Sequence, residues 1–66
     1  MKVKINGDER EIKSGANLLD LLAELELKKD RVAVELNRVI VDKNLFSATL
    51  INEHDELEIV YFVGGG

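Results

Sequence analysis

The chain opens with polar and apolar residues in alternation, the pattern of a half-buried strand. Val3 and Ile5 alternate with lysines, and the pair Asn6-Gly7 separates them from a second short stretch. Asn-Gly between such segments is a strong hairpin signal, because both residues tolerate the positive φ of a type I′ turn. The pattern therefore predicts two strands, near residues 2–6 and 9–13.

The next segment, residues 17–27, is rich in leucine and has a helical period instead. Its leucines recur at spacings of three and four, which places them on one face of a helix. Asn17 is a suitable N-cap, and Asp20 puts negative charge in the first turn, where the helix dipole favours it. We expect one amphipathic helix over roughly residues 18–27, ended by the lysines of KKD. Its apolar stripe would comprise Leu18, Leu21, Leu22 and Leu25, broadened by Leu19 and Ala23.

Residues 32–41 predict a second hairpin. Val32, Val34 and Leu36 share one face of a strand, and an Asn37-Arg38 turn leads to a short apolar run at 39–41. The following LFSATLI has no clean period, so we expect an irregular connector or a short helical turn. The side chains of this connector expected to plug the core are Leu45, Phe46 and Leu50.

A polar turn, NEHDE, precedes the last strand, in which Leu57, Ile59 and Tyr61 alternate with Glu58, Val60 and Phe62. Two strands, one helix and further strands predict an α+β domain of the ubiquitin-like β-grasp type. Such a fold is a mixed four- to five-stranded sheet packed on one main helix, with the first and last strands parallel at its centre. We assign residues 1–63 to this domain and residues 64–66 to a flexible C-terminal glycine tail.

Composition limits the kinds of partner and the cellular compartment that we expect for this chain. The chain has 66 residues, 45% hydrophobic and 33% charged, which fits a soluble globular domain with a thin core. The net charge of −4 argues against nucleic acid and favours a basic partner surface. Apolar runs are too short to cross a bilayer, and the chain opens on a strand pattern rather than a signal peptide. We expect a cytoplasmic protein that is monomeric when free.

No constellation of side chains looks catalytic, so we expect a protein that is not itself an enzyme. There is no cysteine to supply a thiolate or a metal ligand. The single histidine, His54, falls in a polar turn where a solvated role is the simpler interpretation. The acidic clusters lack the spacing of a calcium loop, so we expect no metal site.

Three of the five glycines occupy the last three positions, 64–66. They are either an untied chain end or a slender thread that enters a narrow cleft of another protein. In the second interpretation, the reactive group is the terminal carboxylate of Gly66, which an adenylate would activate toward a sulfur or nitrogen nucleophile. Alternation also places Val60 and Phe62 on the sheet face opposite the helix, near Ala33. They are either docking residues beside the tail, with Glu35 and Glu58 as an acidic rim, or ordinary surface hydrophobics.

These features together resemble the ThiS family of sulfur carrier proteins, related to MoaD among the ubiquitin-like carriers. The likeness lies in the opening VKINGDER, the leucine-rich helix, the VAVELNRVIV segment and the terminal FVGGG, and it covers essentially the whole chain. Where many relatives have glycine in the acidic turn, this chain has His54, which suggests a slightly different turn.

The resemblance implies a cycle in thiamine (thiazole) biosynthesis. A ThiF or E1-like adenylating enzyme would use ATP and Mg to activate Gly66, with Gly65 and Gly64 threading its channel. Sulfur from a donor such as a cysteine desulfurase would then give a thiocarboxylate, and a ThiG-like thiazole synthase would accept the sulfur. No cofactor would be bound by the carrier itself.

Three other functions fit the same sequence. A sulfur carrier of another pathway, such as MoaD-like molybdopterin synthesis, would have the same fold and terminus. A ubiquitin-like modifier would end in an isopeptide bond to a lysine rather than carrying sulfur. A pure interaction module would keep its activity after loss of Gly65 and Gly66.

Overall fold

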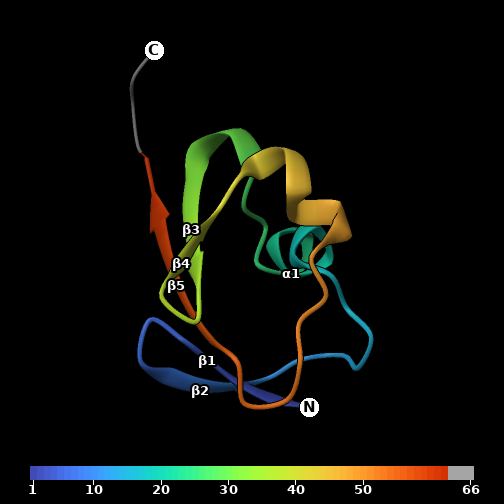
Figure 1. The fold of residues 1–66 in the computed structure, drawn as a ribbon. Coiled ribbons are helices and arrows are strands. Elements are labelled where there is room, and N and C mark those ends of the chain that lie inside the picture. The colour runs from blue at the N-terminus through green and yellow to red at the C-terminus, as the bar shows by residue number, and fades with distance from the viewer. Residues whose placement is uncertain (63–66) are drawn as a thin grey trace.

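The computed structural model describes residues 1–62, which form five strands, one α-helix and two short 3-10 helices (Figure 1). In chain order, these elements are β1 (Lys2–Ile5), β2 (Asp8–Glu11), α1 (Leu18–Glu24), η1 (Lys29–Arg31), β3 (Val32–Leu36), β4 (Val39–Val41), η2 (Lys43–Ala48) and β5 (Glu56–Tyr61).

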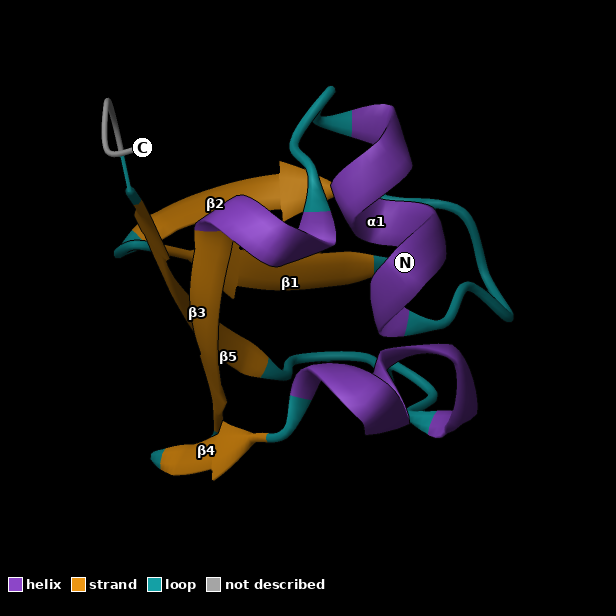
Figure 2. Cartoon of the chain, turned by 90° about the horizontal axis from the view of Figure 1, so that it is seen from above, coloured by secondary structure: helices purple, strands orange, loops and turns teal. Residues whose placement is uncertain are grey.

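The strands form one mixed sheet in the order β2-β1-β5-β3-β4. β1 and β5 are parallel, with Lys4 beside Glu56 and Ile5 beside Leu57, whereas the other neighbours are antiparallel. Figure 2 shows α1 and η2 on the same side of the sheet. The predicted β-grasp fold, with the first and last strands paired near the centre of the sheet, is therefore confirmed.

The core lies between α1 and one face of the sheet. Leu18, Leu21 and Leu22 are buried as predicted, and Leu25 packs against them from the edge of the core. Leu19 and Ala23 are exposed, so the prediction that they broaden the apolar stripe is wrong. A helix of two turns presents only one narrow side to the sheet, and these two residues lie outside it.

Both predicted hairpin turns are present, and the positive φ expected at Asn6-Gly7 is also found at Asn37-Arg38. Asn6 and Gly7 have φ of 51° and 86°, and Asn37 and Arg38 have φ of 51° and 72°. Two consecutive positive φ values match the right-handed twist of the flanking strands. β2 ends at Glu11, two residues before the predicted end of the second strand.

Helix α1 also ends earlier than predicted. Glu24 is its last residue, and Glu26 takes a left-handed conformation with φ of 59°. The Leu27 N–H donates to the Leu22 carbonyl (2.8 Å) and the Glu26 N–H donates to the Ala23 carbonyl (3.1 Å). These bonds are those of a Schellman cap, a position where glycine is usual, and this cap rather than the lysines of KKD ends the helix.

The connector after β4 is the 3-10 helix η2, which supplies one large side chain to the core. Phe46 is buried, whereas Leu45 and Leu50 are exposed, so the prediction that these two leucines plug the core is wrong. Ile51 takes the inward position instead of Leu50. Side chains in an extended segment alternate between faces, and the shift by one residue inverts the assignment.

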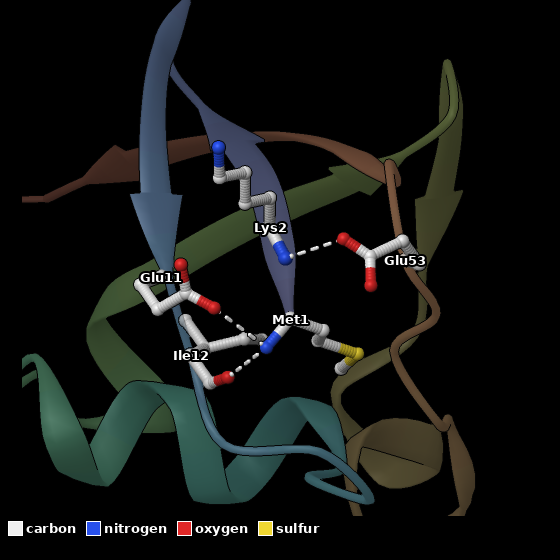
Figure 3. A network of polar contacts seen from close by, with 5 residues as sticks. All are labelled: Met1, Lys2, Glu11, Ile12 and Glu53. Carbon is white, nitrogen blue, oxygen red and sulfur yellow. Dashed lines mark hydrogen bonds and ion pairs between the residues drawn. The ribbon is translucent and has the colours of Figure 1, made fainter.

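The start of the chain is held at the edge of the core (Figure 3). The Met1 amine donates to the Ile12 carbonyl (2.8 Å) and pairs with the Glu11 carboxylate (2.9 Å). The Lys2 N–H donates to the carboxylate of Glu53 (2.7 Å), which ties β1 to the turn before β5. The hydrogen bond from the Met1 amine, and then its charge, hold the pKa of Glu11 below its ordinary value.

The left-handed residue after α1 gives a stability prediction. Replacing Glu26 by glycine removes the steric penalty of positive φ, and we expect the free energy of unfolding to rise by about 0.5–1 kcal/mol. Urea unfolding followed by circular dichroism measures the change. The matched control is Glu24→Gly at the last helical residue, which should lower stability by about 0.5–1 kcal/mol. Equal decreases in the free energy of unfolding for Glu26→Gly and Glu24→Gly would show that the cap is not strained.

Candidate functional site

The site expected from the sequence is the C-terminal end of β5 together with the terminal glycines. β5 lies between β1 and β3, and it runs beside β3 to the end of the molecule opposite the β1–β2 hairpin (Figure 1). The Phe62 N–H donates to the Arg31 carbonyl (2.7 Å), so the pairing continues to the last described residue. Gly64, Gly65 and Gly66, the predicted sulfur-carrying and channel-threading residues, lie outside the described residues.

The side chain of Asn6 holds β5 where β1 ends. Its Nδ2 donates to the Ile59 carbonyl (3.0 Å), and its Oδ1 accepts from the Ile59 N–H (2.7 Å). The amide group thus takes the place of one further residue of β1 and satisfies both backbone groups of Ile59. The turn residue of the first hairpin therefore fixes the strand that leads to the terminus.

The alternation predicted for β5 is confirmed. Leu57 and Ile59 are buried beneath α1, whereas Val60 and Phe62 are 56% and 54% exposed. Val60 lies directly opposite Ala33 of β3, as expected. Tyr61 departs from the expected burial, since it is on the helical side of the sheet but 45% exposed at the end of the core.

The apolar surface extends across three strands on the side of the sheet away from α1. Ile40 of β4 lies opposite Glu35 of β3 and is 76% exposed. Together with Ala33, Val60 and Phe62, Ile40 forms what we call the outer face. In the sequence, Ile40 lies in a short apolar run that does not indicate which face of the sheet its side chain is on. Only the strand register assigns it to the outer face.

Two carboxylates lie within the outer face. Glu35 and Glu58 are directly opposite one another on β3 and β5, and both are exposed. Beside them is a hollow of about 90 Å³ lined by Ala33, Val34, Glu35, Ile40, Glu58 and Val60. The acidic rim proposed from the sequence thus consists of two carboxylates, Glu35 and Glu58, that lie opposite one another beside the hollow.

The described residues also bear on the metal-site and membrane expectations drawn from the sequence. This part of the chain has no group of three His, Asp or Glu side chains placed to hold a metal ion. His54 is exposed in the turn before β5, with φ of 69° and its N–H donating to the Lys2 carbonyl (2.7 Å). Its left-handed backbone explains why glycine also suits this position. No helix in residues 1–62 is long and apolar enough to span a membrane.

Comparison with known proteins places these features in a family. The model of the ThiS family matches residues 3–66. The chain is 37% identical over 65 residues to the sulfur carrier protein ThiS of Bacillus subtilis, covering 97% of this chain and 98% of that protein. It is also similar to the crystal structure of the thiamine biosynthesis protein ThiS from Geobacter metallireducens, with a TM-score of 0.85 and 32% identity over the whole of both chains.

A further relative is much longer than this chain. The chain is 44% identical over 66 residues to a thiazole synthase of Paramagnetospirillum magneticum, and the match covers all of this chain but 20% of that protein. The chain thus spans a fifth of the length of this relative.

The Asn6 contacts give a second prediction. Replacing Asn6 by glycine keeps the positive φ but removes both bonds to Ile59, and we expect a loss of about 1–3 kcal/mol in unfolding free energy. Amide hydrogen exchange should accelerate more at Ile59 than at Leu57, because the backbone bond from residue 6 to the Leu57 carbonyl does not need the Asn6 side chain. If the variant retained both its stability and the protection of Ile59, the Asn6 side chain would not hold β5.

Proposed function

The chain belongs to the ThiS family, and on that basis we propose that it carries sulfur for thiamine biosynthesis on the terminal carboxylate of Gly66. The observation that carries the proposal is the match to the family model over residues 3–66, which includes the three terminal glycines. The similarity to a sulfur carrier protein over nearly the full length of both chains supports it.

The chemistry requires activation of the terminal carboxylate and then substitution at its carbonyl carbon. A Gly66 carboxylate oxygen would attack the α-phosphorus of ATP held with Mg in an adenylating enzyme, forming an acyl adenylate and releasing pyrophosphate. Hydrosulfide would then add to the carbonyl carbon and AMP would leave with one carboxylate oxygen, giving the thiocarboxylate. A persulfide held by a cysteine desulfurase or another donor would first give an acyl disulfide, which a thiol would reduce to the thiocarboxylate with release of a disulfide. A glycine at this position leaves the carbonyl carbon unhindered, because it has no Cβ.

The carrier contributes position rather than catalysis in this proposal. β5 is held between two strands and by Asn6, so the terminus begins from a fixed point in the fold. Val60 and Phe62 project from the same strand as exposed apolar side chains, and we assign them to docking on the partner enzymes. Gly64 and Gly65 would thread the partner's channel. The protein is then a cosubstrate of the adenylating enzyme and of a thiazole synthase.

The third prediction tests the chemistry directly. Incubation with ATP, Mg, sulfide and the adenylating enzyme of the same organism should increase the intact mass by the exchange of one oxygen for sulfur, and fragmentation should locate the change on Gly66. Deleting Gly66 should abolish this exchange without changing the melting temperature, because this residue lies beyond the core strand in the sequence. An unchanged mass with continuing ATP–pyrophosphate exchange would favour a ubiquitin-like modifier instead.

The fourth prediction concerns docking. Phe62→Asp should raise the KM for the carrier in the adenylation assay by about tenfold or more, since loss of an interface hot spot costs about 2 kcal/mol or more and tenfold corresponds to about 1.4 kcal/mol. Leu45→Asp is the matched control, because Leu45 is 55% exposed but belongs to η2 on the helical side. Equal KM values for the two variants would remove Phe62 from the docking surface.

A further inference from the structure

The hollow beside Glu35 and Glu58 has no role in the chemistry at Gly66. It lies on the outer face, where β3, β4 and β5 are adjacent, and Ile40 and Val60 border it. We propose that this hollow receives an arginine side chain of a thiazole synthase, with the guanidinium group bridging the two carboxylates. The inference rests on the proposed function and adds the contact by which one partner is recognised.

The pair of carboxylates is unfavourable in the isolated domain. Directly opposite residues on antiparallel strands have Cβ atoms about 5 Å apart, and like charges in this position destabilise the sheet. Within residues 1–62, ion pairs join Met1 to Glu11 and Lys43 to Asp30, and neither involves Glu35 or Glu58. Neither pair therefore offsets the repulsion in the described part of the chain, and a cation from outside would relieve it.

The surroundings of the carboxylates favour arginine over a free cation or lysine. Ile40 and Val60 are exposed apolar side chains against which the methylene stem of a long basic residue can pack. A guanidinium group is planar and weakly hydrated and offers several donors at once, so it can bond to two carboxylates together. The hollow of about 90 Å³ is well below the roughly 300 Å³ or more of small-molecule pockets, so it fits a single side chain.

The choice of thiazole synthase as the partner comes from the long relative. A sequence 44% identical to this chain forms a fifth of a thiazole synthase, so carrier-like and synthase segments occur in one polypeptide. A surface between two such segments can be kept when they are separate proteins. The net charge of −4 on this chain favours a partner that presents a basic surface.

The experiment measures the affinity of the full chain for the thiazole synthase of the same organism by isothermal titration calorimetry. The double variant Glu35→Gln/Glu58→Gln should bind more than about tenfold more weakly, because truncating one side of a desolvated charge pair is costly. Its melting temperature should stay the same or rise, since the repulsion is removed. Glu24→Gln/Glu26→Gln changes the net charge equally at exposed positions at the end of α1, on the other side of the sheet, and it should bind like the original protein.

The arginine is then identified on the synthase. Alanine replacement of each surface arginine should reveal one whose loss weakens the original carrier but not the double glutamine variant. A lysine at that position should restore only part of the affinity. The inference is overturned if the original chain does not bind the synthase, if both double variants bind equally, or if no arginine couples to the glutamates. Thiocarboxylate formation on Gly66 needs only the adenylating enzyme and sulfide, so failure of the inference and failure of the sulfur-carrier proposal are separable.

Discussion

The parallel pairing of β1 with β5 is the contact on which the rest of the molecule depends. It joins Lys4 to Glu56 and Ile5 to Leu57, and the Asn6 amide extends it to Ile59, 53 positions further along the chain. Because β5 also pairs with β3, this contact unites two hairpins into one sheet broad enough to cover α1. It also places the strand that leads to Gly66 in the interior of the sheet, where two neighbours restrain it.

The sheet has two faces with separate purposes. The face toward α1 holds the buried apolar residues, and its composition is decided by packing. The outer face carries exposed apolar residues, among them Ile40, Val60 and Phe62, together with two facing carboxylates, none of which the core requires. Exposed residues that the core does not require, some of them on or directly after β5, suit recognition by other proteins.

Much of this arrangement could be predicted from the sequence, because strand alternation, Asn-Gly turns and leucine spacing are local signals. The parallel pairing of the first and last strands followed from the β-grasp pattern, and the exposure of Val60 and Phe62 followed from alternation. The predictions are wrong where two local signals compete, or where tertiary packing determines which side chains are buried. Glu26 lies just beyond the end of α1 although glutamate favours helices, because the Schellman bonds to Leu22 and Ala23 offset its left-handed backbone.

The candidate site was predicted in outline for a similar reason. Terminal glycines are visible in any sequence, but the facing of Glu35 with Glu58 depends on register across β3 and β5. The bonds from the Asn6 side chain to Ile59 could not be predicted, because the turn alone already accounts for an asparagine at this position. The prediction that Leu45 and Leu50 lie in the core is wrong because a segment without a period does not indicate which of its side chains point inward.

The position of β5 in the sheet has a consequence for synthesis of the protein. β5 leaves the ribosome after β1 and β3, yet it must insert between them. Until it does so, the two hairpins have no common sheet, and the outer face lacks Glu58, Val60 and Phe62. A nascent or prematurely terminated chain therefore lacks the complete docking surface that we propose, and assembly of that surface coincides with completion of the strand that precedes Gly66 in the sequence.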